Sequence, residues 1–166
     1  MAFVRFLVLS AFLLFLHAGP VAARQDDQRL IPLFEKLSGT KDFAEAKDIE
    51  RNIWEIWMSS GSQAVDLLMF DGVQNMTLGR YWRALYLFTA VIEMDPGFAE
   101  AWNKRATVHY LVGDLTGSIE DVGRVLELEP RHFGAFAGLG QIYERRKAPD
   151  QAVSAFEKAL RINPHM

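Results

Sequence analysis

Residues 92–96 read IEMDP, residues 126–130 read LELEP and residues 160–164 read LRINP, so one short pattern recurs at a constant interval. In each copy, two apolar residues flank a charged one, and a proline closes the segment. Proline lacks a backbone N–H and its ring clashes with the preceding helical turn, so a helix is expected to end just before it. Three helices that end at one fixed spacing predict a structural repeat.

Other residue types keep the same spacing inside each repeating unit. The unit 133–166 carries aromatic residues, a Leu-Gly pair and alanines at intervals that suit two antiparallel helices. This pattern resembles the tetratricopeptide repeat, a helix pair of about 34 residues. The positions that carry the resemblance in the units 65–98, 99–132 and 133–166 are Gly72, Ala84, Phe88, Pro96, Trp102, Ala106, Pro130, Phe136, Gly140, Tyr143, Ala152, Phe156 and Pro164.

The resemblance implies an all-α fold, a right-handed α-solenoid of antiparallel helix pairs. Two helices can approach closely only where a residue is small, and large aromatic residues then fill the gaps beside them. One helix pair cannot bury its own apolar face, so at least three pairs are expected to stack. The small residues expected to face each other are Gly72 and Ala84, Ala106 and Ser118, and Gly140 and Ala152.

Residues 24–64 are expected to form a further helix pair that has drifted from the repeat pattern. A short apolar helix at 30–37 would be followed, after a Ser-Gly-Thr break, by an amphipathic helix at 42–58. Trp54 and Trp57 fall on the apolar face of the second helix. Two interpretations remain open: a degenerate first repeat that acts as an N-terminal cap, or an independent cap hairpin.

Residues 1–23 are expected to be a secretory signal peptide. Arg5 supplies a positive charge before the apolar run 6–16, and small residues precede a cleavage point after Ala23. A helix of that run covers roughly 16 Å of a hydrocarbon core of ~30 Å, which disfavours the alternative of a retained anchor helix. The mature chain would then have no membrane span, and it would be exported, to the periplasm or outside the cell.

Composition and motifs argue against several classes of function. The formal net charge is −3, so no basic excess is available for binding a nucleic-acid backbone, and the absence of cysteine excludes disulfides and thiolate chemistry. His109 is expected to be a packing residue, His132 a surface residue after Pro130, and no histidine pair has the spacing of a helical metal site. Nucleophile-elbow, phosphate-loop and dinucleotide motifs are absent. We therefore expect a protein that is not an enzyme and needs neither cofactor nor metal.

In the resembled family, the first helix of each pair lines a concave face that binds peptides. The resemblance therefore implies a groove for a protein or peptide ligand. Gly134 and Gly138 lie in one expected helix, where each costs roughly 1 kcal/mol relative to alanine. Close approach of a ligand or another helix would offset that cost, although Gly134 could instead lie in a fraying first turn. The groove residues implied are Asp66, Met69, Val73, Met76, Glu100, Asn103, Thr107, Tyr110, Gly134, Ala137, Gln141 and Glu144.

Arg105 stands where the resembled family usually has an inward-facing leucine. A buried charge needs a partner, so we expect a structural ion pair between Arg105 and either Asp71 or Asp121. Asp71 occupies the equivalent position one repeat earlier.

The last repeat is expected to end without the polar capping helix that usually closes such arrays. Its outer face would then offer an apolar surface for self-association or for a partner. The residues expected near that surface are Val153, Ala155 and Leu160.

Taken together, the sequence predicts an exported, non-catalytic scaffold that binds another protein. The whole chain resembles small signal-bearing repeat proteins of proteobacterial cell envelopes, and this resemblance implies a role in envelope assembly or maintenance. The alternative is a holdase-type chaperone for exported proteins, which would bind many unfolded chains weakly instead of one dominant partner.

Overall fold

The computed structural model describes residues 27–166, so the expected signal peptide lies outside the described residues. Helices are the only regular secondary structure in this range, and none of them is long and apolar enough to cross a membrane. They are α1 (Leu30–Gly39), α2 (Phe43–Trp57), α3 (Gln63–Thr77), α4 (Tyr81–Met94), α5 (Ala99–Val112), α6 (Leu115–Leu128), α7 (Phe133–Arg145) and α8 (Pro149–Ile162).

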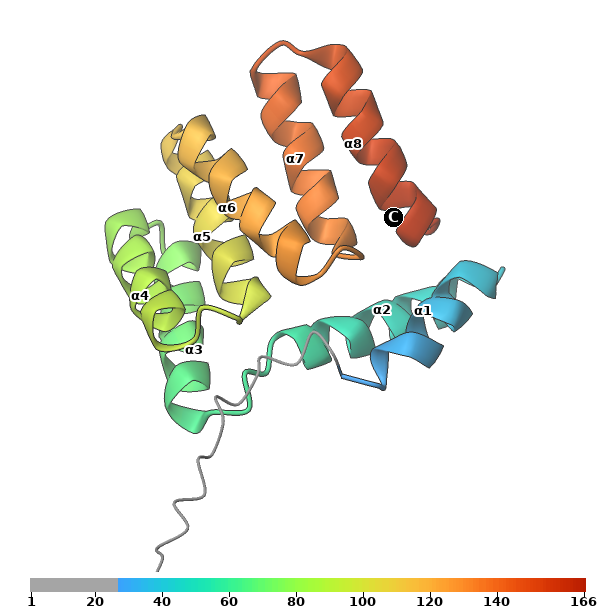
Figure 1. Cartoon of the computed structure of the whole chain (residues 1–166), viewed down its shortest axis with the longest axis horizontal. Coiled ribbons are helices and arrows are strands. Elements are labelled where there is room, and N and C mark those ends of the chain that lie inside the picture. Colours follow the sequence, from blue (N-terminus) through green and yellow to red (C-terminus); the bar gives the residue numbers. More distant parts are fainter. Residues whose placement is uncertain (1–26) are drawn as a thin grey trace, which may run out of the picture.

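Three antiparallel pairs, α3–α4, α5–α6 and α7–α8, stack side by side in chain order (Figure 1). The pairs share apolar cores: Phe88 and Val91 of α4 pack in one cluster with Ala101 and Val108 of α5. The predicted all-α helical solenoid is therefore confirmed. This arrangement follows from the repeat, because each pair buries its apolar face only against its neighbour.

The repeated prolines follow helix ends that are built alike. The residue before each proline lies just beyond α4, α6 or α8, and its side-chain oxygen accepts the backbone N–H two residues on. The distances are 3.2 Å for Asp95, 2.9 Å for Glu129 and 3.1 Å for Asn163. The proline itself needs no hydrogen-bond acceptor, because it has no N–H to donate. Each of these turns is thereby closed by its own side chain.

The turns inside the three pairs also match. Gly79, Gly113 and Lys147 occupy the same position in successive units and have positive φ angles of 70°, 89° and 58°. Glycine adopts this left-handed conformation without a steric penalty, whereas lysine does not. The third pair therefore keeps the turn of the other two at an energetic cost.

Contacts inside the pairs explain two of the packing glycines. A Cβ on Gly72 would come within 2.5 Å of the Phe88 ring, and a Cβ on Gly140 would come equally close to the Phe156 ring. The aromatic ring of the second helix therefore leaves room only for glycine on the first helix. This contact adds to the small residue that was expected opposite the glycine. In the middle pair the Ser118 hydroxyl instead donates to the Ala106 carbonyl oxygen at 2.8 Å.

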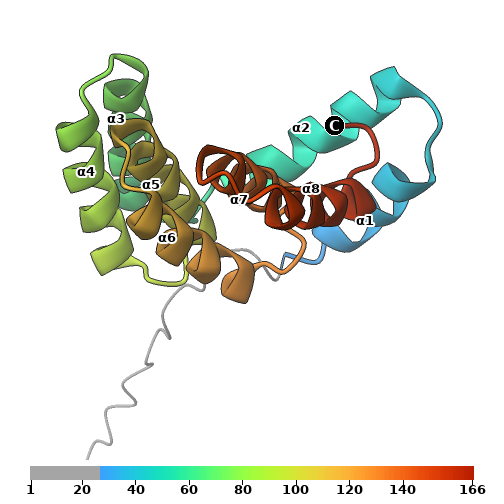
Figure 2. The same ribbon diagram turned by 90° about the horizontal axis from the view of Figure 1, so that it is seen from above.

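The helices α1 and α2, called the N-terminal hairpin below, do not stack on α3 as a preceding repeat would. Leu67 of α3 is 62% exposed, whereas the equivalent Ala101 is fully buried by the pair before it. The hairpin instead packs on the third pair, where Phe133 and Ile162 join its core (Figure 2). The observed packing is that of a hairpin seated on the third pair, not of a unit stacked in register on α3.

Arg105 forms the expected ion pair, and its partner is Asp121. The guanidinium donates to both carboxylate oxygens at 2.8 and 2.7 Å, and a further bond reaches Thr89 at 3.2 Å. Asp71 is exposed, so its assignment to a buried pair is wrong. The physical reason is the position of the N-terminal hairpin, since no described helix covers this side of α3.

The outer face of α8 agrees only in part with expectation. Val153 and Leu160 are exposed, but Ala155 is buried. Near its end, α8 also touches the N-terminal hairpin, because Ile162 packs against the hairpin core and Asn163 lies within 3.4 Å of Glu50. Self-association through the exposed part of α8 stays a prediction.

The positive φ of Lys147 gives a stability prediction. Lys147→Gly should raise the free energy of unfolding by about 0.5–1 kcal/mol, because glycine removes the left-handed backbone penalty. Urea denaturation measures this difference. Gly113→Lys, the reverse change one repeat earlier, should destabilise by a comparable amount, and a loss of stability in Lys147→Gly would contradict the argument.

Candidate functional site

A cavity of about 300 Å³, called the groove cavity below, opens between α5 and α7. Tyr110 and Gly138 belong to the walls supplied by these two helices, and Ser118 and Val122 come from α6. Trp54 of the N-terminal hairpin also lines it, although it is far away in sequence. A concave site with aromatic walls and a few amide and hydroxyl groups suits a peptide side chain.

Half of the groove residues implied by the resemblance meet in this cavity. The first pair contributes none of them: Met69 is 1% exposed and belongs to the apolar core, and Val73 and Met76 pack against that core. Met69 was wrongly placed on an open groove wall, because Met58 from the end of α2 covers the same cluster. Glu144 is exposed away from the cavity. The implied residues that do line the cavity are Asn103, Thr107, Tyr110, Gly134, Ala137 and Gln141.

Glu100 stands in a groove position but is completely buried. Its carboxylate accepts a hydrogen bond from Asn103 Nδ2 at 2.9 Å, and Lys104 Nζ lies 2.8 Å from its other oxygen. His132 Nε2 lies 3.0 Å away. Burial raises the pKa of Glu100. The Lys104 charge and the His132 hydrogen bond together lower it by more than burial raises it, so the pKa lies below the ordinary 4.5. Glu100 is therefore a buried, ionised carboxylate.

His132 connects this carboxylate to the start of α7 and to the N-terminal hairpin. Its Nδ1 accepts the Ala135 N–H at 3.0 Å, which caps α7. With Nδ1 as acceptor, the proton of a neutral ring must sit on Nε2, where it is donated to Glu100. The ring also stacks on Trp57 with centroids 4.2 Å apart. The expectation that His132 is a surface residue is wrong, since it is 1% exposed.

The N-terminal hairpin crosses three equivalent groove positions in turn. Trp54 lies on Gly134, Trp57 covers the His132 ring that binds Glu100, and Ser60, after α2, donates to Asp66. Figure 1 shows α2 running past the ends of α7 and α5 toward the start of α3. Asp66, Glu100 and Gly134 occupy the same position in successive units. One edge of the concave face is thus occupied by the chain's own N-terminal segment.

Comparison with known proteins agrees with this repeat geometry. A family model described as tetratricopeptide repeat matches residues 76–126 and 112–166. A TPR repeat-containing protein of Rhizobium etli is 34% identical over 143 residues, which cover 86% of this chain and 70% of that protein. The chain belongs to the tetratricopeptide-repeat family.

More distant relatives are also similar to this chain. The small glutamine-rich tetratricopeptide repeat-containing protein 2 of Saccharomyces cerevisiae is 27% identical over 75% of this chain and 35% of its own length. Among solved structures, MamA superposes with a TM-score of 0.55 at 20% identity, covering 84% of each chain. At this identity the likeness concerns the fold.

The two additional glycines of α7 in this tetratricopeptide-repeat protein have different reasons. A Cβ on Gly134 would lie 2.8 Å from the Trp54 ring, so close approach of another helix explains this glycine. A Cβ on Gly138 would meet no atom of the described residues within 4 Å. Since Gly138 also lines the groove cavity, its missing side chain leaves open space at the site.

Sequence reasoning missed the residues that the N-terminal hairpin brings to the site. Trp54 and Trp57 lie on the apolar face of α2, and from the sequence they were expected only to pack inside the N-terminal helix pair. The roles of their partners were missed as well, since His132 was expected on the surface and Lys104 was not assigned to the groove. The one available signal was Gly134, whose cost in a helix is offset by the close approach of the Trp54 ring.

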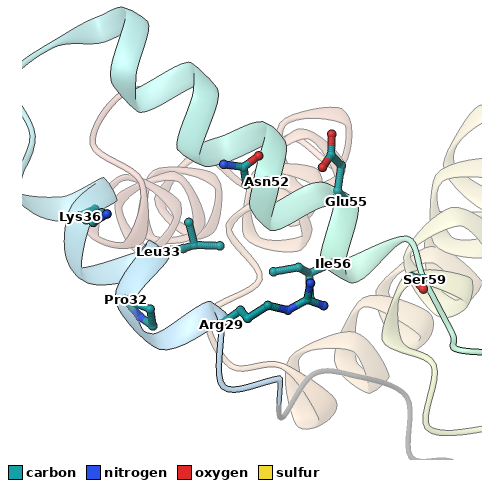
Figure 3. A pocket seen from close by; sticks show the side chains of 8 residues that line it. All are labelled: Arg29, Pro32, Leu33, Lys36, Asn52, Glu55, Ile56 and Ser59. Carbon is teal, nitrogen blue, oxygen red and sulfur yellow. The ribbon is translucent and has the colours of Figure 1, made fainter.

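A second cavity, of about 540 Å³, lies within the N-terminal hairpin between α1 and α2 (Figure 3). Leu33 and Ile56 form its apolar part, and Glu55 and Lys36 are among its polar residues. The Arg29 guanidinium at its edge donates to both carboxylate oxygens of Asp27. Sequence reasoning assigned no residue to this cavity, and its charged groups do not converge on one point, so we place the candidate site in the groove cavity.

The buried carboxylate predicts a pH-dependent stability difference. Glu100→Gln should lower the free energy of unfolding by about 3 kcal/mol at neutral pH, because Lys104 loses its buried counter-charge. The folded-state pKa of Glu100 is lowered, so its contribution is complete above the ordinary value of 4.5 and is lost as the pH falls below it. Urea denaturation of both proteins at about pH 7 and about pH 3.5 should therefore show a gap that narrows in acid. A gap that is the same at both pH values would contradict an ionised Glu100.

Proposed function

We propose that this chain is a non-catalytic protein-binding scaffold that holds a segment of a partner polypeptide in the groove cavity. Tetratricopeptide-repeat proteins generally act as scaffolds for protein interactions. The single observation that carries the proposal is the open space over Gly138, between the Tyr110 side of α5 and the Trp54 ring. An apolar side chain of the partner would fill this space.

Polar groups around the cavity support a peptide ligand. The Nδ2 of Asn103 donates to Glu100, which leaves Oδ1 able to accept a peptide N–H. Gln141, also on the cavity wall, can both donate and accept. A few amide groups beside an apolar space can fix the orientation of an extended or helical segment.

Export is the second part of the proposal, and residues 1–23 support it. A positively charged start, a short apolar run and small residues before Arg24 are typical of a secretory signal. We propose the periplasm as the main location, with secretion as the alternative, and a role in envelope assembly or maintenance.

A holdase is the alternative, and the exposed apolar residues of the first pair favour it. Trp82 is 77% exposed and Tyr86 lies one turn further on the same face of α4. Such side chains could contact many unfolded chains weakly. A scaffold that uses the groove cavity predicts one dominant partner instead.

Filling the groove cavity tests the proposed site. Gly138→Leu should weaken partner binding by about tenfold or more, because its side chain occupies the space meant for the ligand. Gly123→Leu on α6 is the matched control, since Gly123 is exposed, a Cβ there meets no described atom within 4 Å, and the same change is made in a helix. Partners crosslinked to a photoreactive residue at Gln141 in the producing cells would be identified, and their affinities measured with purified proteins.

The same experiment separates the alternatives. A dominant partner that Gly123→Leu retains and Gly138→Leu loses would agree with the scaffold. Equal capture by both variants would refute the groove cavity as the binding site. A broad set of unfolded clients that depends on Trp82 and Tyr86 would favour the holdase.

Export gives a separate prediction. The protein isolated from producing cells should begin at Arg24, because a signal peptidase would cut after the small residues that precede it. Intact-mass measurement and N-terminal sequencing of the envelope and culture fractions check this. A full-length chain with its original start, found inside the cell, would contradict export.

A further inference from the structure

The N-terminal hairpin occupies groove positions that a ligand would otherwise use. The Ser60 backbone N–H and hydroxyl both donate to Asp66 at 2.7 Å. Trp57 stacks on His132, and Trp54 contacts Gly134 and lines the groove cavity. An amphipathic helix whose aromatic residues enter a concave surface is itself a recognised mode of peptide binding.

The N-terminal hairpin is also built to move as a unit. Leu37 of α1 and Ile49 and Ile53 of α2 belong to a core that the two helices share. The linker to α3 is the short run Ser59 to Ser62, which includes Gly61 at a φ of 82°. Detachment would keep the contacts between α1 and α2, and the small residues of the linker would allow the movement, but it would expose Trp57 and Phe133, which meet at the interface.

The N-terminal hairpin is held to the rest of the molecule mainly by one type of contact. Ring contacts dominate: Trp54 and Trp57 meet His132 and Phe133 with centroids 4.2–5.6 Å apart, and Arg131 lies over the Phe34 ring. The Trp57 indole N–H is buried and has no hydrogen-bond partner among the described residues. A buried donor without an acceptor weakens the docked state, because it loses its bond to water and gains none.

We propose that the N-terminal hairpin is a displaceable occupant of the groove, and that the partner's binding element is a helix with two aromatic residues at the spacing of Trp54 and Trp57. This inference rests on the proposed function. In the partner-bound state, the two aromatic residues take the places of Trp54 on Gly134 and Trp57 on His132. The tethered hairpin competes at a high effective concentration, so only a partner that matches this pattern displaces it.

The chain's own α2 supplies a probe of stated chemistry. A labelled peptide of residues 43–58 carries Trp54 and Trp57 at the spacing that the site accepts. It should bind a Trp54→Ala/Trp57→Ala variant of the whole protein about tenfold more tightly than the wild type, because the tethered copy no longer competes well. The same peptide with both tryptophans changed to alanine is the control and should not bind.

A second experiment uses a crosslink that holds the N-terminal hairpin in place. It gives a result even if the tryptophan variants do not fold. Glu50 and Asn163 approach to 3.4 Å between hairpin and α8, and the chain has no cysteine of its own. A Glu50→Cys/Asn163→Cys protein would be measured untreated, with both thiols reduced, and after oxidation to the disulfide, because Asn163 is fully buried and a bulky reagent would not reach it. The peptide should bind the untreated protein and should lose about tenfold or more in affinity once the crosslink has formed.

Three results would overturn the inference. Equal peptide affinity before and after crosslinking would show that the N-terminal hairpin is a fixed wall. Crosslinked dimers in place of an internal bridge would show that the hairpin caps a second copy. Loss of partner capture in Gly138→Leu, combined with no peptide binding to any variant, would leave the groove proposal standing and refute displacement alone.

Discussion

Glu100 is a charged carboxylate without access to water, and the geometry of the site depends on how that charge is compensated. A buried ion is tolerated only when a counter-charge and hydrogen bonds replace its hydration. Lys104 and Asn103 supply part of this from the same helix, α5, and His132 supplies the rest from the start of α7. The carboxylate therefore fixes the distance between two neighbouring repeats at the edge of the groove cavity. Trp57 then covers the imidazole and excludes water from the group.

Repeat spacing was sufficient to predict the helices and their order. Proline, glycine and aromatic residues at fixed positions encode local turns and close contacts, and these depend on residues within one unit or the next. Repeat spacing did not decide the partner of Arg105. Two aspartates were possible, and the one that binds Arg105, Asp121, is buried. Asp71 occupies the equivalent position in the first repeat but faces solvent. No described helix covers that side of α3, so the same position in the sequence has a different environment there.

The site was harder to predict because one of its walls, Trp54, comes from outside the repeats. Six of the residues implied by family positions line the cavity: Asn103, Thr107, Tyr110, Gly134, Ala137 and Gln141. They failed near the N-terminal hairpin: Met69 lies in an apolar cluster against which Met58 packs, and Glu100 is buried beside the His132 ring on which Trp57 stacks. The apolar periodicity of α2 indicates that it packs against something, but it carries no information on which helix it meets. That choice is made by shape and charge around His132 and Phe133, which lie two repeats further along the chain.

Docking of the N-terminal hairpin onto the α7–α8 pair has a consequence for how the protein unfolds. An open array of repeats can unravel from either end, because each unit is held only by its neighbour. Here the terminal units hold each other through Trp57 and Phe133, so fraying at one end exposes apolar surface at the other. Unfolding should therefore be more cooperative than that of a linear array of the same length, and folding slower, since this contact closes a long loop.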